Sequence, residues 1–153
     1  MAELPGASAD LLRPLTRAER LLSRRIGAVL APEGLTVEAW RVLCLLADGL
    51  GHPMTEVAAE ACLPPGTLTK LVDQLVDRNL VFRRVDPYDR RRIRACLTVR
   101  GRREHDRLEA MVRADLAELT GGAGEEEALT RRLADLVTRL DPDRPRQPTP
   151  ALR

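Results

Sequence analysis

Arginine is concentrated in one short stretch of the chain. Residues 81–103 hold nine arginines against two aspartates, a net charge of +7, whereas the whole chain carries only +2. A strongly basic segment on an otherwise acidic protein is typical of proteins that bind a polyanion. Arginine suits phosphates and minor grooves because its planar guanidinium can donate several hydrogen bonds at once. The first chemistry that the sequence indicates is therefore nucleic-acid binding.

The basic stretch has the residue pattern of a β-hairpin. Apolar and polar residues alternate in Val81–Val85 and again in Arg92–Thr98, which predicts two half-buried strands. Between them, Pro87 restricts the turn backbone. The carboxylates of Asp86 and Asp89 can accept hydrogen bonds from nearby amides, so we expect a tight turn that presents the arginines.

Two short helices are predicted immediately before the hairpin. The first is an alanine-rich helix over Thr55–Cys62, with Thr55 as its cap. The second has an apolar face at helical spacing from about Pro65 to Arg78, and Asn79 can end it in a left-handed conformation. Helix, turn, helix and basic hairpin is the order of a winged helix-turn-helix, whose second helix enters a major groove about 12 Å wide.

The predicted contacts with double-stranded DNA come from the second helix and from the hairpin. Threonine and lysine suit phosphates or base edges, glutamine can pair with adenine, and a helix N-terminus attracts phosphate. Asp73 and Asp77 are expected to pair with nearby arginines instead. The candidate DNA-binding residues are Pro65, Gly66, Thr67, Thr69, Lys70, Gln74, Asp89, Arg90, Arg91 and Arg92.

Long amphipathic helices are predicted on either side of this unit. Apolar residues recur at helical spacing from Ala9 to Leu30 and over 98–119, and a last helix follows the glycine-rich break Gly121–Gly124. Thr36 is the expected cap of the helix that follows the first. His52-Pro53 is a candidate edge strand beside the hairpin.

The predicted fold is mainly α with a small β-hairpin wing. Its aromatic content of only 2% requires a core of leucine, valine and alanine, which favours helices. The 153 residues form a single domain by size. Within it, 9–35 and 99–140 are expected to be dimerisation helices, 36–98 the winged helix-turn-helix, and 141–153 a proline-rich disordered tail.

Three segments of the chain resemble the MarR family (multiple antibiotic resistance regulators), in that family's order and spacing. They read LTVEAWRVLCLL, MTEVAAEACLPPGTLTKLVDQLVDRNLV and DPYDRRRIRACLTVRG, and the similarity covers about residues 10–140. Two positions depart from the family pattern. Cys62 stands where a turn glycine is usual, and Pro64 replaces the serine that usually caps the second helix.

The resemblance implies roles for particular residues. Arg91 is expected to reach the minor groove, with Asp89 bracing it. The family consists of homodimers with interlocking terminal helices, so the two apolar faces gain a partner. Trp40 is most simply a core residue, but the resemblance places it near a cleft where small-molecule effectors often bind.

Other residue types provide little support for catalysis or metal binding. We find no nucleophile–base pair, phosphate loop or paired carboxylates, so neither an enzyme nor a cofactor is predicted. His52 and His105 have no clustered carboxylates or thiols in the sequence, so no metal site is expected. Cys44 is expected to be an inert buried thiol, and Cys62 is the better candidate for redox chemistry.

The sequence therefore predicts a cytoplasmic homodimer that binds a pseudo-palindromic operator as a repressor and is released by a small-molecule effector. Activation is an open possibility. Three cysteines without paired spacing indicate a reducing compartment, and no apolar run reaches the roughly 18–20 residues of a membrane span. The N-terminus lacks the layout of a signal peptide. The alternatives are a winged-helix interaction or architectural module without an effector, and a thiol-based redox-sensing regulator.

Overall fold

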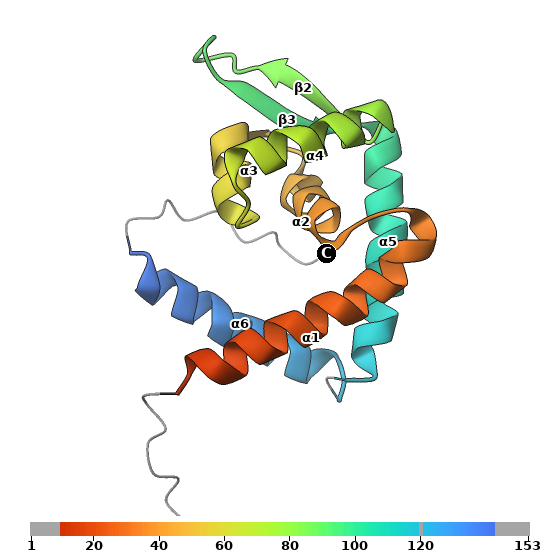
Figure 1. Cartoon of the computed structure of the whole chain (residues 1–153), viewed down its shortest axis with the longest axis vertical. Coiled ribbons are helices and arrows are strands. Elements are labelled where there is room, and N and C mark those ends of the chain that lie inside the picture. Colours follow the sequence, from red (N-terminus) through yellow and green to blue (C-terminus); the bar gives the residue numbers. More distant parts are fainter. Residues whose placement is uncertain (1–9, 120, 143–153) are drawn as a thin grey trace, which may run out of the picture. The chain divides into compact units, whose positions relative to one another are not determined.

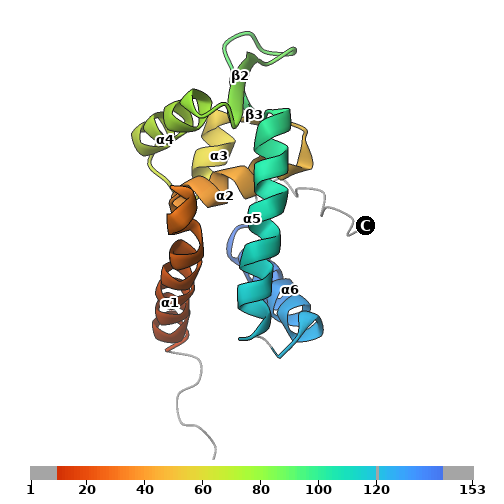
Figure 2. The same cartoon turned by 90° about the vertical axis from the view of Figure 1, so that its right-hand side faces the viewer.

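Helices dominate the computed structural model, which describes residues 10–119 and 121–142 (Figures 1 and 2). The chain forms two units, Met1–His105 and Asp106–Arg153. The first unit contains α1 (Leu12–Leu30), η1 (Ala31–Glu33), α2 (Val37–Leu45), η2 (Leu46–Asp48), β1 (His52–Pro53), α3 (Met54–Glu60), α4 (Pro65–Asp77), β2 (Val81–Val85), β3 (Ile93–Leu97) and the first turns of α5 (Val99–Ala117). The second unit contains the rest of α5 and α6 (Ala123–Leu140). The prediction of a mainly α fold with a β-hairpin wing is confirmed.

The core of the first unit is built from aliphatic side chains around α2. Its fully buried members come from α1, α2, η2, α3, α4, the sheet and the residue before β2: Leu30, Val42, Leu43, Leu46, Val57, Leu68, Val72, Leu75, Leu80, Val81 and Ala95. Trp40 is also buried, at 7% exposure, and its ring stacks on His105 with centroids 5.2 Å apart. The interpretation of Trp40 as a core residue is therefore confirmed.

The hairpin belongs to a three-stranded antiparallel sheet in the order β1-β3-β2. Val81 pairs with Leu97 and Val85 with Ile93, and the predicted edge strand His52–Pro53 pairs with β3. The third strand is shorter than predicted at both ends. The amide of Arg92 donates to the Asp89 carbonyl in the turn, and Thr98 accepts a hydrogen bond from the Gly101 amide, 2.8 Å away, at the start of α5.

The ends of the first helices follow their capping residues. Gly34, at φ 67°, ends η1, and Thr36 caps α2 by accepting from the Ala39 amide at 3.2 Å, as predicted. The predicted cap at Thr55 is wrong. The helix α3 begins one residue earlier, directly after the extended Pro53 of β1, and no side chain caps it.

The later helices are close to their predicted extents. Among the described residues, α1 begins at Leu12 and α5 ends at Ala117, each slightly inside the predicted range. The glycine-rich break is shorter than predicted: Gly121 and Gly122 have positive φ, whereas Gly124 already lies within α6. The predicted disordered tail lies outside the described residues from 143 onwards.

Large apolar side chains remain exposed on the flanking helices of each unit. On α1 they are Leu12, Leu21 and Leu22, and on α6 they are Leu129, Leu133, Val137 and Leu140. In the described part of the chain, no helix combines the length and apolar character needed to cross a bilayer.

Candidate nucleic-acid interface

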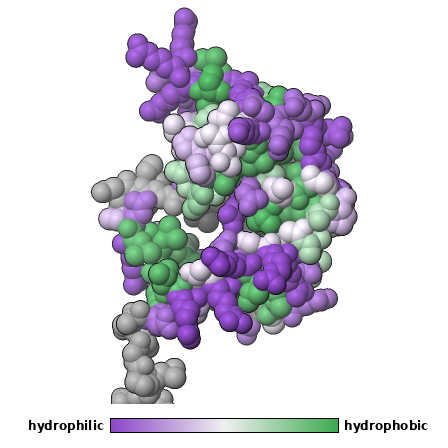
Figure 3. All heavy atoms as spheres, viewed as in Figure 1, coloured by the Kyte–Doolittle hydropathy of each residue, from purple (hydrophilic) through white to green (hydrophobic). Residues whose placement is uncertain are grey.

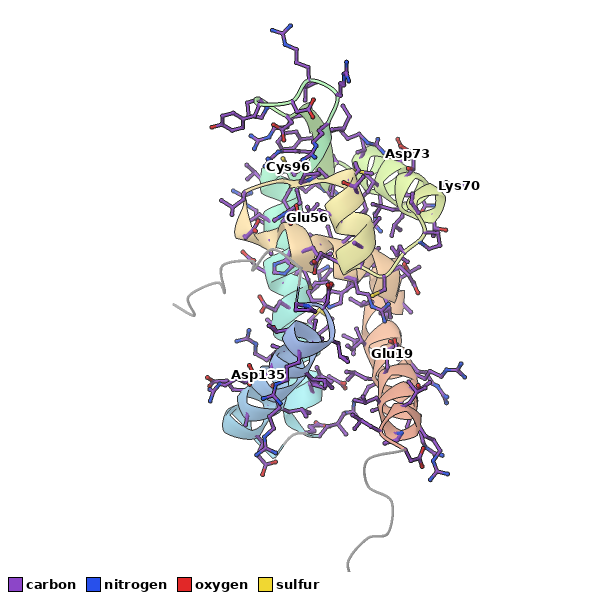
Figure 4. The ribbon with its side chains drawn as sticks, turned by 90° about the vertical axis from the view of Figure 1, so that its left-hand side faces the viewer. Glu19, Glu56, Lys70, Asp73, Cys96 and Asp135 are labelled. Atoms are coloured by element: carbon purple, nitrogen blue, oxygen red, sulfur yellow. The ribbon has the colours of Figure 1, made fainter. Side chains whose placement is uncertain are left out.

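The helix α4 separates its residues into a buried face and an exposed face. Leu68, Val72 and Leu75 are at most 1% exposed, which fixes the helix on the core. The opposite side presents all of the predicted contact residues of this helix to solvent. They are Pro65, Gly66, Thr67, Thr69, Lys70 and Gln74, and Figure 4 marks Lys70 on this helix.

The N-terminal turn of α4 has no side-chain cap. Pro64 is the N-cap residue and cannot supply a capping oxygen, as the sequence indicated, and Pro65 has no amide proton. The amides of Gly66 and Thr67 therefore face solvent as donors at the positive end of the helix dipole. Such a turn is suited to receive a phosphate oxygen.

The hydroxyl of Thr69 is already used inside the helix. It donates to the carbonyl of Pro65 at 3.0 Å. Its oxygen can therefore accept a hydrogen bond from a base, whereas a phosphate, which has only acceptor oxygens, gains nothing from it. Of the two candidate threonines, Thr67 is the better phosphate donor.

The turn between α3 and α4 is made by Cys62 in a left-handed conformation, with φ of 55°. The Cys62 amide donates to the Ala59 carbonyl, and the Leu63 amide donates to the Ala58 carbonyl. These hydrogen bonds set the angle between the two helices at a position where a side chain disfavours the backbone geometry. Cys62 therefore takes a conformation that glycine, the usual residue of this turn in the family, would adopt without strain.

The loop of the wing is organised around the carboxylate of Asp86, which is 3% exposed. One oxygen accepts from the amides of Tyr88 at 2.8 Å and Asp89 at 3.3 Å, and the other pairs with Nε of Arg94 at 2.5 Å. Arg94 also donates to the Gly51 carbonyl at 3.1 Å, which ties the loop to the segment before β1. The Arg94 guanidinium and the Tyr88 amide hold the pKa of the Asp86 carboxyl below its ordinary value.

Asp89 braces the arginines that follow it. Its carboxylate accepts from the Arg91 amide at 3.0 Å and lies 3.5 Å from Nε of Arg92. Asp89 therefore supports Arg91 through its backbone amide and Arg92 through its side chain. Arg90, Arg91 and Arg92 are exposed, and Figure 3 shows the projecting end of the hairpin as hydrophilic.

Several arginines of the basic segment serve the protein itself. Arg83 pairs with Asp73 of α4 at 2.7 Å and also donates to the carbonyl of Thr69, so it joins β2 to α4. Arg84 donates to the Leu50 carbonyl at 3.1 Å. The expected pairing of Asp73 is confirmed, whereas Asp77 has no ion pair within the described residues, because no guanidinium reaches it. The +7 charge thus overstates the number of arginines that are free to meet DNA.

Carboxylates do lie near both histidines, contrary to the expectation from sequence. His52 has Asp48 at 2.6 Å from Nε2 and Glu56 at 3.4 Å from Nδ1, and these contacts lie on opposite sides of the ring. On α5, ligand atoms of His105, Asp106 and Glu109 lie within 4.8 Å of one another. On α5, helical spacing places His105 and Glu109 one turn apart, whereas His52 lies in β1 between Asp48 of η2 and Glu56 of α3.

Trp40 lines a cavity of about 400 Å³ between α1, α2 and the end of α3. Its apolar wall consists of Leu22, Ile26, Val37, Trp40 and Leu45. Cys44 also lies on this wall, and it is exposed, so the expectation of a buried thiol is wrong. The reason is its position one turn after Trp40, on the side of α2 that faces the cavity rather than the core.

Sequence reasoning missed the residues that hold the interface in place. The sequence indicates Asp86 only as a turn residue, and Arg83 and Arg94 only as part of the basic charge. The hydrogen bonds from the loop amides to Asp86 agree with the turn expected from the sequence, because a carboxylate two residues before a loop amide is the pattern of a turn that hydrogen-bonds to its own backbone. The buried pairing with Arg94 depends on strand register, which the pattern alone does not specify.

Comparison with known proteins gives consistent results. Residues 33–92 match the model of the MarR family. The HTH-type transcriptional repressor Rv2887 of Mycobacterium tuberculosis is 33% identical over 100 residues, which cover 65% of this chain and 72% of the relative. The structure of Rv2887 in complex with salicylic acid has a TM-score of 0.67 at 31% identity, covering 84% of this chain and 96% of that one.

A second solved structure covers nearly the whole chain. CouR from Rhodococcus jostii RHA1, bound to p-coumaroyl-CoA, has a TM-score of 0.74 at 29% identity, over 95% of this chain and 99% of that one. The match extends beyond the helix-turn-helix and wing to the flanking helices. From the family match, the curated relative and the shared fold, we conclude that the chain belongs to the MarR family of transcriptional regulators.

Proposed function

We propose that the protein is a homodimeric repressor that binds a pseudo-palindromic operator and is released by a small-molecule effector. The observation that carries the proposal is the pairing of an uncapped, polar α4 turn with a wing loop whose arginines are exposed. In this proposal Gly66, Thr67, Lys70 and Gln74 meet the major groove. Arg90 and Arg91 reach the flanking minor groove or backbone.

The proposal assigns the exposed apolar side chains of α1 and α6 to a second copy of the chain. A row of leucines facing water marks an interaction surface. A twofold dimer sets its two recognition helices about 34–36 Å apart, one turn of the double helix or a multiple of it. In this proposal the dimer is formed by residues 9–35 and 99–140, and the operator is read by residues 36–98. The protein would act in the cytoplasm, where the DNA lies.

The effector part of the proposal rests on the cavity beside Trp40. Rv2887 has been crystallised with salicylic acid and CouR with p-coumaroyl-CoA, so relatives of this fold accept small organic ligands. A ligand that prefers a conformation with mismatched half-site spacing releases the operator only in proportion to its differential affinity for the two conformations. The cavity lies between α1, a proposed dimer helix, and α2, the first α-helix of the proposed DNA-reading part.

The test is fluorescence anisotropy with the full chain and a labelled duplex of the DNA upstream of its own gene. We expect binding that saturates at one dimer per site and resists unlabelled random duplex. The affinity should fall steeply with salt, because several phosphates are neutralised. Equal affinity for random and upstream DNA would favour an architectural module, and no salt-sensitive binding to any duplex would contradict the proposal. Light scattering that gives a monomer at micromolar concentration would contradict the dimer.

A further inference from the structure

Arg78 connects the end of α4 to the segment that ends α1. It is the C-cap residue of α4, and its guanidinium donates from Nη1 to the Gly34 carbonyl at 2.8 Å and from Nη2 to the Glu33 carbonyl at 3.1 Å. All three residues lie within the first unit. We infer that Arg78 is a positioning residue, which sets the spacing of the two recognition helices in the dimer by connecting α4 to the end of α1. The inference rests on the dimer and the operator of the proposed function.

The two acceptors of Arg78 are carbonyls at the end of a helical segment. The helix η1 follows α1 directly, and its C-cap Gly34 has a left-handed φ of 67°. The last carbonyls of a helix have no donors within it, and the negative end of the helix dipole favours a cation. A guanidinium suits two adjacent carbonyls because its donors form a rigid planar fork. Arg78 therefore caps the end of the α1–η1 segment from a different helix.

These hydrogen bonds cross the boundary between the proposed dimer helices and the proposed DNA-reading part. Glu33 and Gly34 belong to residues 9–35, whereas Arg78 belongs to residues 36–98. The chain turns at Gly34 before Thr36 caps α2. A rotation of the DNA-reading part about this turn moves the guanidinium relative to both carbonyls. The contact therefore opposes a motion that would change the distance between the two recognition helices of a dimer.

The other contacts of α4 restrict its position in a different way. The apolar face of the helix is buried on the core, which stabilises it strongly but has no preferred direction. Arg83 pairs with Asp73 and connects α4 to β2, which belongs to the same DNA-reading part. Arg78 adds directional, charge-assisted hydrogen bonds to the end of a proposed dimer helix. Its loss should therefore change the placement of α4 in the dimer more than its reading surface.

The test measures how strongly the dimer discriminates between half-site spacings. Footprinting of the DNA upstream of its own gene locates the operator. One base pair is then added to or removed from the operator centre, which moves a half-site by about 3.4 Å and rotates it by about 34–36°. Fluorescence anisotropy gives the affinity of the full chain for each duplex. We expect the wild type to bind the altered spacings at least about tenfold more weakly, because the protein or the DNA must deform to fit.

Two variants of Arg78 separate the geometry of its donors from its charge. Arg78→Gln removes the guanidinium, so the loss of affinity at the altered spacings should shrink to about threefold or less. Its affinity for a single half-site should remain unchanged. Arg78→Lys keeps the charge but lacks the planar fork that reaches two carbonyls, so it should restore only part of the discrimination. Arg91→Ala is the comparison variant, and as a DNA contact it should weaken binding at every spacing by the same factor.

Amide hydrogen exchange of the full chain, followed by NMR, tests the same contact without DNA. The Gly34 amide closes the end of η1, and the Leu80 amide closes the end of α4. Without the guanidinium both ends should open more often, so these two amides should exchange about tenfold faster in Arg78→Gln. The Tyr88 amide, which is hydrogen-bonded within the wing, is the internal control and should exchange at the same rate in both proteins.

The outcomes separate this inference from the proposed function. Equal affinity of the wild type for all spacings, unchanged discrimination or unchanged exchange in Arg78→Gln, or full recovery in Arg78→Lys would overturn the inference. Equal losses of Arg78→Gln at every spacing would also overturn it, because they would indicate a DNA contact or a loss of stability alone. If the wild type binds no duplex, the proposed function fails, and the exchange rates still decide whether Arg78 connects α4 to the end of α1.

Discussion

The two parts of the candidate interface are held in place by different forces. The helix α4 lies on the core through Leu68, Val72 and Leu75, which are almost completely buried. The wing loop has no apolar anchor of this kind: Val85 and Ile93, the last strand pair before the loop, are both exposed. Its shape depends on Asp86, whose carboxylate gathers two amides and Arg94.

Because of this difference, substitutions in the two parts should change different properties of the protein. Removing apolar contacts under α4 affects the whole core, because burial of aliphatic surface is the main stabilising term of a small domain. Removing the polar contacts of the wing affects a loop that the core does not require. We therefore expect substitutions below α4 to reduce stability and substitutions in the wing to reduce operator affinity.

The largest expected effect comes from Leu75→Ala, which truncates a side chain that is 1% exposed. It should lower the free energy of unfolding by about 2–5 kcal/mol, because it removes buried hydrocarbon and leaves a cavity. Urea denaturation of the dimer at fixed concentration measures the change. Gln74→Ala, on the exposed face of the same helix, is the control and should leave stability within about 0.5 kcal/mol. Equal losses in the two variants would contradict the assignment of the faces.

The next effect concerns contact with DNA. Arg91→Ala should weaken operator binding by about 1–3 kcal/mol while the stability and the dimer remain unchanged, as expected for an exposed contact residue. Fluorescence anisotropy at several salt concentrations measures the affinity, and the salt dependence should become shallower if a phosphate contact is lost. Arg83→Ala is the comparison variant, because the guanidinium of Arg83 is already paired with Asp73 within the protein. Unchanged affinity of the Arg91 variant would show that the wing does not touch the operator.

Asp86→Ala tests whether the wing acts only when its loop is ordered. The amides of Tyr88 and Asp89 and the guanidinium of Arg94 lose their shared acceptor, so the neighbouring arginines should lose their fixed placement. We expect operator affinity to fall on the order of tenfold, comparable with the loss of one contact residue, although Asp86 itself need not touch DNA. Asp77→Ala, an exposed acid on α4, is the control for the change in charge.

The pH dependence of this contact has a defined sign. The pKa of Asp86 is lowered in the folded protein, so its contribution to stability is present above the ordinary carboxyl pKa and is lost as pH falls through the lowered value. Unfolding free energies of the wild type and of Asp86→Asn should differ by a constant amount from pH 7 down to about 5. The difference should shrink below about pH 4. A difference that grows on acidification would contradict the role of the carboxylate.

Much of the fold was predictable because local patterns and global packing agree. Thr36, Gly34 and Asn79 end or begin helices where their local chemistry requires it, and the helical spacing of α4 identified its buried face. A tertiary contact explains the glycine at position 101, because a Cβ there would clash with the Leu80 carbonyl. That contact, like the Asp86–Arg94 pair, joins residues whose approach depends on strand register. A single sequence shows the residue types but not the partner.

The smallest expected effect lies at the turn that joins α3 to α4. Cys62 has φ of 55°, a conformation that costs a non-glycine residue roughly 1–2 kcal/mol. Cys62→Gly removes this strain. The greater conformational entropy of glycine, however, stabilises the unfolded chain by roughly 0.5–1 kcal/mol. The net gain in unfolding free energy should therefore lie between about 0 and about 1.5 kcal/mol, measured by urea denaturation. Asn79→Gly is the matched control at φ 57°, and because asparagine tolerates this conformation, it should gain less.

A stabilised Cys62→Gly variant with unchanged operator affinity would mean that the strain at this turn is not needed to hold α4 in its reading position. A variant that loses affinity as it gains stability would mean that the strained turn sets the angle at which α4 meets the groove.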